Sequence, residues 1–146
     1  AAGLTALRGA VPPALDAPLR VIVQGDVPTD MVSEAGPTGR QAVALFGAFT
    51  DAQVLMVDDI AKLDWATVPQ DGRRNLLVST RRARYGAAAA GWRPDLHITL
   101  WNPYQALDVA GPTLVSWGFA PGALAAVQAW LEGRADATGR APRGLQ

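Results

Sequence analysis

Carboxylates are the residues of this sequence whose types and positions could do hydrolytic chemistry. Cleavage of a glycosidic bond needs two of them, roughly 5 to 10 Å apart, as proton donor and as nucleophile or base. Glu34 stands out, because it lies in a long loop flanked by glycines that could swing over a neighbouring site. Spacing alone pairs none of the carboxylates, and a solvated loop residue is the competing interpretation of Glu34. The candidates in loops or at the ends of apolar runs are Asp26, Asp30, Glu34, Asp58, Asp59 and Asp108.

Nucleophilic and metal-dependent chemistry finds little support in the sequence. The chain has no cysteine, which excludes thiol catalysis, disulfides and thiolate metal sites. Its one histidine, His97, lies in the middle of the apolar run LHITLW, a position that predicts a hydrogen-bonded core residue rather than a metal ligand or base. Ser33, Ser79 and Ser116 all lack the G-x-S-x-G surroundings of a hydrolase nucleophile. We therefore expect neither a metal site nor a cofactor.

Charge, hydropathy and motifs indicate whether the chain could bind nucleic acid, a membrane or an anion. The 13 basic and 13 acidic residues cancel and no basic cluster stands out, so we expect no nucleic-acid binding. No apolar run reaches the roughly 18 residues of a membrane span. Residues 36–39 open a predicted helix whose amides could hold an anion, with an ordinary helix cap as the alternative. The sequence leaves open whether a soluble chain of this kind is cytoplasmic or secreted.

Two tryptophans close apolar runs on either side of an Asn-Pro-Tyr turn. Trp101 and Trp117 end predicted strands, and Asn102 and Tyr104 lie in the turn that follows the first of them. Aromatic faces at the ligand-bearing edge of a sheet suit stacking on a sugar or contact with a second domain. Packing within the core is the competing role for each tryptophan.

Short apolar runs alternate along the chain with stretches of helical periodicity. Thr38 and Gln41 form a capping box at the start of the first predicted helix, which buries Ala42, Leu45, Phe46 and Phe49. Strands alternating with helices predict an α/β fold with a mostly parallel, doubly wound sheet in a three-layer, Rossmann-like sandwich. Ligands of such folds gather at the carboxyl ends of the strands. The predicted strands are residues 4–8, 19–23, 53–57, 75–80, 96–101 and 113–117, and the other predicted helices lie within 58–68, 82–92 and 121–133.

The chain is divided on composition into three parts. Its 146 residues fit one domain. Residues 1–18, with a Pro-Pro break, are predicted to be a linker from an N-terminal domain that precedes this chain. Residues 19–134 form the predicted α/β sandwich, and residues 135–146 form an extended or frayed tail.

The last third of the chain resembles the end of the family-3 glycoside hydrolases, particularly their β-N-acetylhexosaminidase branch. Asn102-Pro103-Tyr104 matches the N-P-Y-D turn of the family, and Trp117-Gly118 matches its aromatic-Gly strand end. The opening AAGLTALRG is similar to the segment that leads out of the family's barrel. The helix end and the closing motif are matched by Leu131, Gly133, Gly139 and Pro142, whereas the departures are Gln105 for Asp, Glu132 for Phe, and Ala141 and Arg143 for Leu and Val.

The resemblance implies a partner and a function. The family's nucleophile is an aspartate on an N-terminal (β/α)8 barrel, and some β-glucosidase members take an acid/base glutamate from a loop of the second domain; Glu34 is the one analogue in this chain. We therefore expect an accessory domain that packs on the barrel, helps to shape an N-acetylglucosaminide site, and hydrolyses nothing alone. Trp101, Asn102, Tyr104 and Trp117 are the residues expected at the substrate or at the domain interface. The alternative is a non-catalytic α/β binding or interaction module without sugar chemistry.

Overall fold

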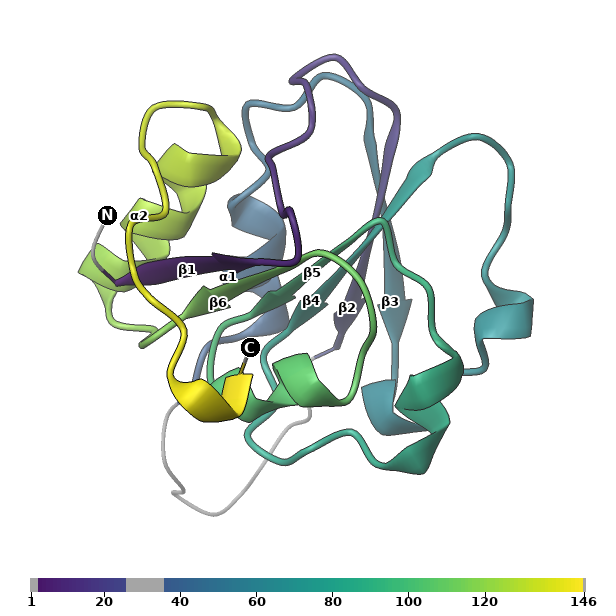
Figure 1. The fold of residues 1–146 in the computed structure, drawn as a ribbon. Helices are drawn as coiled ribbons and strands as arrows, with labels where there is room; N and C mark the ends of the chain where they lie inside the picture. Colours follow the sequence, from purple (N-terminus) through teal and green to yellow (C-terminus); the bar gives the residue numbers. More distant parts are fainter. Residues whose placement is uncertain (1–2, 26–35, 146) are drawn as a thin grey trace, which may run out of the picture.

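Six strands form one mostly parallel sheet in the order β1-β6-β5-β4-β2-β3 (Figure 1). The computed structural model describes residues 3–25 and 36–145. β2 to β6 run parallel to their neighbours, whereas β1 pairs antiparallel with β6, from Leu4 opposite Ser116 to Leu7 opposite Thr113. The predicted α/β class with a mostly parallel sheet is confirmed. The strands are β1 Leu4–Leu7, β2 Leu19–Gln24, β3 Ala52–Val57, β4 Arg74–Ser79, β5 Leu96–Thr99 and β6 Thr113–Ser116.

Different elements pack on the two faces of the sheet. The α-helices α1 (Gly39–Ala44) and α2 (Pro121–Leu131) pack on one side, which we call the α face, over Val21, Val78 and Leu114. Short 3₁₀ helices cover the other side, the 3₁₀ face, over Ile22 and Leu77 and over Val115. They are η1 Ile60–Lys62, η2 Trp65–Thr67, η3 Ala87–Gly91, η4 Pro103–Leu107 and η5 Arg143–Leu145.

The apolar runs become central strands because both of their faces are covered. Every residue of β5 and β6 is buried, as is nearly all of β2 and β4. This is why their sequences read as continuous β-branched and leucine runs rather than as alternating patterns. β3, at the edge of the sheet, is instead largely exposed.

The helix ends follow the local signals in the sequence. The Thr38 hydroxyl accepts a hydrogen bond from the Gln41 N–H at 3.0 Å, and the Gln41 side chain accepts one from the Thr38 N–H at 2.9 Å. This reciprocal pair confirms the predicted capping box. After α2, Gly133 takes a φ of +76°, the left-handed ending that its type predicts.

The structure corrects the helix predicted over residues 82–92. Only Ala87–Gly91 turns, as the 3₁₀ helix η3, and Gly86 before it has a φ of +98° that no helix contains. Asp108 also accepts a hydrogen bond from the Tyr85 N–H at 3.1 Å, which takes this N–H away from a helical hydrogen bond. Tertiary contacts therefore override the helix propensity of the alanines.

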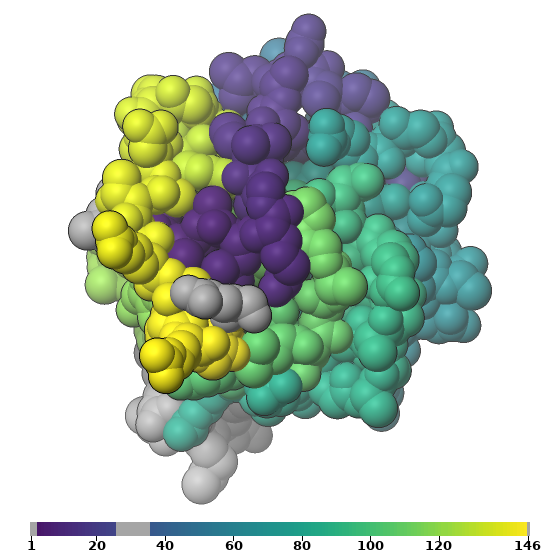
Figure 2. Space-filling view, in the orientation of Figure 1, coloured from purple at the N-terminus to yellow at the C-terminus, as the bar shows by residue number. Residues whose placement is uncertain are grey.

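Both ends of the described chain belong to the packed fold. Residues 4–7, which the sequence assigned to a linker, form β1 because Leu4 and Leu7 are buried in the sheet. The tail, predicted to be extended or frayed, has no helix or strand over residues 136–142, and it is packed on the fold rather than frayed. The Gly139 N–H donates to the Leu4 carbonyl at 2.7 Å, and Leu145 is buried against Leu7. Figure 2 shows the tail (yellow) lying against the N-terminal segment (purple).

Candidate functional site

The crossover connections define one point of the sheet where a ligand would be expected. β2 continues through α1 on the α face to β3, whereas β3 returns through η1 and η2 on the 3₁₀ face to β4. The strand order therefore changes direction between β2 and β4. In doubly wound sheets, ligands bind outside the carboxyl ends of the strands at such a point. We call this place the switch point.

The polar side chains at the switch point bind one another. Gln24 Oε1 accepts a hydrogen bond from the Ile60 N–H at 2.9 Å. Arg81 Nη1 donates to Asp59 Oδ1 at 2.9 Å, and the same oxygen accepts the Ala61 N–H at 3.0 Å. Asp59 is thus held in an ion pair and positions η1, an arrangement that suits structure better than proton transfer.

A hollow of 530 Å³ lies beside the switch point, after the end of β3. Its lining mixes apolar surface from Val57 and Leu63 with polar groups of both signs of charge, from Asp58, Asp59, Lys62, Asp64 and Thr67. Among the described residues, no cluster of three or more acidic or histidine side chains could hold a metal ion. The hollow therefore offers hydrogen-bonding groups for a polar ligand rather than a metal centre.

The Asn-Pro-Tyr-Gln turn at the end of β5 holds the segment that follows β4. Asn102 Oδ1 accepts the Tyr104 N–H at 2.9 Å, which starts η4, and its Nδ2 donates to the Arg82 carbonyl at 3.0 Å. Gln105 is fully buried, and its Nε2 donates to the carbonyls of Arg81 and Ala83 at 2.9 and 2.8 Å. Two side-chain amides thereby bind three consecutive carbonyls. Both polar atoms of Asn102 are used inside the chain.

Trp101 packs inside this edge instead of lining it freely. Its ring lies 5.0 Å from the ring of Phe119, at 53°. Gly36 approaches the other side so closely that a Cβ there would lie 1.8 Å from Trp101 Cζ3. The tryptophan therefore connects the segment before α1 to the segment before α2.

Tyr104 and Trp117 remain exposed at the carboxyl edge. Tyr104 is 52% exposed and Leu107, in the same 3₁₀ helix, is 47% exposed. Trp117 is 42% exposed, although its Nε1 donates to Thr5 Oγ1 at 2.8 Å. The elements are neighbours, because Ala106 of η4 packs on Val115 of β6. We call Tyr104, Leu107 and Trp117 the apolar edge patch.

His97 is a satisfied core residue, as predicted. Its Nε2 lies 2.7 Å from the Tyr85 hydroxyl and its Nδ1 lies 3.3 Å from Thr113 Oγ1. Burial, with a smaller contribution from the charge of Arg8, lowers the pKa of His97 to about 3. The imidazole is therefore neutral and has no free nitrogen for a substrate.

Asp108 is likewise committed to partners within the chain. Its carboxylate accepts two hydrogen bonds from Arg84, at 2.9 and 2.5 Å, and one from the Tyr85 N–H. Burial alone would raise the pKa of Asp108, but the bonds from Arg84 and Tyr85 hold it below its usual value. This bidentate pair positions the Tyr85 segment, and it leaves no proton on Asp108 to donate at neutral pH.

Among the predicted carboxylates that lie within the described residues, the structure assembles no hydrolytic pair. Asp59 and Asp108 belong to separate ion pairs, and Asp58 lines the hollow. Asp26, Asp30 and Glu34 lie outside the described residues, as does Ser33. The capping box uses one amide of the segment 36–39 that was considered for an anion, since the Thr38 N–H donates to the Gln41 side chain. No helix within residues 3–25 and 36–145 is long and apolar enough to cross a membrane.

Sequence reasoning missed several of the side chains that build this edge. Arg8 donates to the carbonyls of Ala106, Val109 and Gly111, and Gln105 binds the segment after β4. No motif marks either residue. The one available signal was Gln105 itself, a polar residue in an otherwise apolar stretch where the resembled family has Asp.

Neither family models, curated proteins nor solved structures yield a match to this chain.

Proposed function

We propose that this chain is an accessory α/β domain of a glycoside hydrolase of the β-N-acetylhexosaminidase type, which packs on a catalytic (β/α)8 barrel. In this proposal the 3₁₀ layer takes the place of a second helical layer, so that the fold is a variant of the three-layer, doubly wound sandwich. The observation that carries the proposal is the apolar edge patch. Tyr104 and Leu107 of η4 and Trp117 at the end of β6 are large, exposed hydrophobic residues on neighbouring elements.

The chemistry of the edge favours binding over catalysis. A retaining hydrolase needs a carboxylate nucleophile and a proton donor that face one bond. Within the described residues, Asp59 and Asp108 are ion-paired and His97 is buried and neutral. We therefore expect the chain alone to hydrolyse nothing, with the reacting groups supplied by the barrel.

The apolar edge patch has two compatible uses. Aromatic rings stack on the apolar face of a sugar, and exposed aromatics are also enriched at the centres of protein interfaces. The hollow beside the switch point adds side chains, among them Asp58 and Lys62, that can hydrogen-bond to hydroxyls. A domain that shapes one side of a sugar site needs both kinds of surface.

The test combines activity with binding. The purified chain and the full reading frame that contains it are assayed with an aryl N-acetylglucosaminide, and we expect turnover only from the longer protein. Tyr104→Ala in the longer protein should raise KM for the substrate or weaken domain docking, with Val11→Ala, exposed in the β1–β2 connection, as the matched control. Turnover by the isolated chain would overturn the inactive-alone proposal. A longer protein without any glycosidase activity would favour the interaction module instead.

A further inference from the structure

We propose that β3 pairs antiparallel with β3 of a second copy of this chain, across a twofold axis, so that two sheets join into one. This inference does not depend on the proposed function. β3 is the last strand of the sheet, and all six of its residues pair with β2 alone, from Ala52 opposite Leu19 to Val57 opposite Gln24. Its other side is free among the described residues.

The backbone of β3 presents a regular row of hydrogen-bonding groups at that free side. The carbonyls of Asp51 and Val57 accept hydrogen bonds from the N–H groups of Leu19 and Gly25, at 2.8 and 2.9 Å. Odd-numbered residues therefore point their N–H and C=O toward β2, because successive residues of a strand point to opposite sides. Ala52, Val54 and Met56 consequently direct both groups outward. Such an edge is a template for pairing with another strand.

β3 lacks the features that normally keep an edge strand single. Its sequence, AQVLMV, contains no charge and no proline, and its pairing with β2 is continuous, without a bulge. The opposite edge of the sheet is treated differently. β1 is two residues shorter than β3, and the C-terminal tail runs beside it, with the Gly139 N–H on the Leu4 carbonyl.

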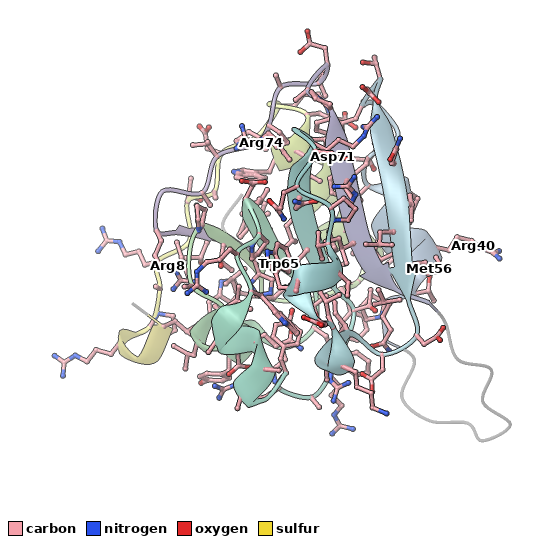
Figure 3. All side chains as sticks on the ribbon, turned by 90° about the vertical axis from the view of Figure 1, so that its right-hand side faces the viewer. Arg8, Arg40, Met56, Trp65, Asp71 and Arg74 are labelled. Atoms are coloured by element: carbon pink, nitrogen blue, oxygen red, sulfur yellow. The ribbon has the colours of Figure 1, made fainter. Side chains whose placement is uncertain are left out.

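Exposed apolar side chains line the free edge of β3 on one face of the sheet. Val54 and Met56 are 47% and 55% exposed, and they lie on the α face because they stand opposite Val21 and Val23. Figure 3 looks onto this edge, with Met56 on β3 and Arg40 projecting from α1 into solvent beyond it. A twofold axis perpendicular to the sheet keeps the α faces of both copies on the same side. The apolar strips of the two copies then form one continuous surface.

The direction of the backbone groups restricts the register. In an antiparallel pair, a residue whose backbone groups point outward must stand opposite another such residue. The outward residues of β3 are even-numbered, so an even-numbered residue faces an even-numbered one and an odd-numbered residue faces an odd-numbered one. Placing Leu55 on the axis sets Val54 opposite Met56 of the partner subunit and centres both apolar strips on each other. Leu55 then faces Leu55 of the partner subunit as a non-hydrogen-bonded pair, with Cα atoms about 4.5 Å apart.

The charges at the strand ends are compatible with this register. Asp51 would lie opposite Asp59 of the partner subunit, and like charges at that position would oppose pairing. Each carboxylate is already neutralised within its own chain, Asp51 by Arg73 at 3.0 Å and Asp59 by Arg81 at 2.9 Å. Every end of the interface therefore carries two compensated ion pairs. In this register β3 matches itself, because Val54 and Met56 of one copy meet Met56 and Val54 of the other, and for this reason the occupant we propose is a second copy.

The first test is the oligomeric state of the full chain. One strand from each copy buries a small area, typical of weak association, so sedimentation equilibrium is measured from about 10 µM to about 1 mM. We expect the chain to dimerise in this range and Val54→Lys to weaken dimerisation at least about tenfold, because two added charges meet at the edge. Val11→Lys, the same change at a site that is 65% exposed and far along the chain, should dimerise like the parent. A parent that stays monomeric, or a dimer retained by Val54→Lys, would overturn the proposal.

The second test fixes the register. The chain has no cysteine, so Leu55→Cys introduces a single thiol, on the predicted axis. A Cα separation of about 4.5 Å falls within the range that a disulfide spans. In a glutathione buffer, we expect Leu55→Cys to form a covalent dimer at least about tenfold faster than Val11→Cys. Equal rates for the two folded variants would overturn the register, and thermal unfolding of the reduced proteins checks that both are folded.

Discussion

The hydroxyl of Tyr85 lies 2.7 Å from Nε2 of His97, and this contact sets the direction of a buried chain of hydrogen bonds. Burial raises the pKa of Tyr85, so its hydroxyl stays protonated. The Thr113 hydroxyl donates to the Gly111 carbonyl at 3.3 Å, which leaves Thr113 Oγ1 to accept the proton of the neutral imidazole from Nδ1. The Tyr85 hydroxyl then donates to the unprotonated Nε2, and a second proton on His97 would require this hydroxyl to turn and accept.

This arrangement predicts that acid destabilises the fold before the carboxylates titrate. In the unfolded chain His97 takes up a proton near pH 6.5, whereas in the folded chain its pKa is about 3. Between these values the unfolded state binds more protons, so its stability relative to the folded state rises as the pH falls. The free energy of unfolding should therefore be highest above pH 6.5 and decrease by up to about 1.4 kcal/mol per pH unit toward pH 3.

Urea unfolding between pH 6.5 and about 5.5 isolates this effect, because His97 is the only histidine and the carboxylates titrate lower. His97→Gln cannot take up a proton, so its unfolding free energy should be flat in this window, whatever its absolute value. A flat profile for the parent chain, or an imidazole NMR titration near pH 6.5 in the folded state, would contradict the prediction.

Arg8 should be a stability determinant, although it lies at the surface. Its Nε donates to the Gly111 carbonyl at 2.6 Å, and its Nη2 lies within 3.2 Å of three acceptors on the η4–β6 segment. Arg8→Ala should lower the free energy of unfolding by about 2 kcal/mol, since charged donors are lost from several carbonyls. Arg8→Lys should lie between the two proteins. Arg40→Ala, at an exposed arginine of α1, should change stability by less than about 0.5 kcal/mol in the same urea experiment.

Gln105 should tolerate no acidic replacement, even though the resembled family has Asp at this position. Its buried Nε2 donates to the carbonyls of Arg81 and Ala83. Gln105→Glu replaces the donor by a buried carboxylate beside two carbonyl oxygens, so we expect a loss of about 3 kcal/mol or more at pH 7. Gln70→Glu, at an exposed glutamine, should cost less than about 0.5 kcal/mol. If both variants had the same melting temperature, the two hydrogen bonds from Gln105 Nε2 would not contribute to stability as we expect.

The strands and the helix cap could be predicted from the sequence because their causes are local. Runs such as Leu19–Val23 bury both faces, and the Thr38–Gln41 capping box needs only a spacing of three residues. The helix predicted over residues 82–92 was wrong because the contacts that decide the structure of this segment come from residues distant in the sequence. Asp108, more than twenty residues further along the chain, accepts hydrogen bonds from Arg84 and from the Tyr85 N–H. No local sequence pattern predicts these bonds.

The edge of the candidate site was predictable, but its pairings were not. The strand alternation places Trp101, Tyr104 and Trp117 at the carboxyl edge, and the structure agrees for all three. It also separates them, since Trp101 is covered by Gly36 and Phe119 whereas Tyr104 and Trp117 are exposed. The exposure of a side chain depends on which distant segments pack over it. The spacing of residues in the sequence does not predict those contacts.

The contact between Gly36 and Trp101 supplies the last prediction. A Cβ at residue 36 would lie 1.8 Å from Trp101 Cζ3, so the ring or the backbone must move in Gly36→Ala. Because the ring also packs on Phe119, we expect a loss of about 1 to 3 kcal/mol and a change in tryptophan fluorescence. Gly47→Ala is the matched control, since its nearest neighbour, the Ala44 carbonyl, lies at an ordinary 3.6 Å. If Gly36→Ala unfolded at the same urea concentration as Gly47→Ala, with unchanged fluorescence, the segment before α1 would not be fixed by Trp101.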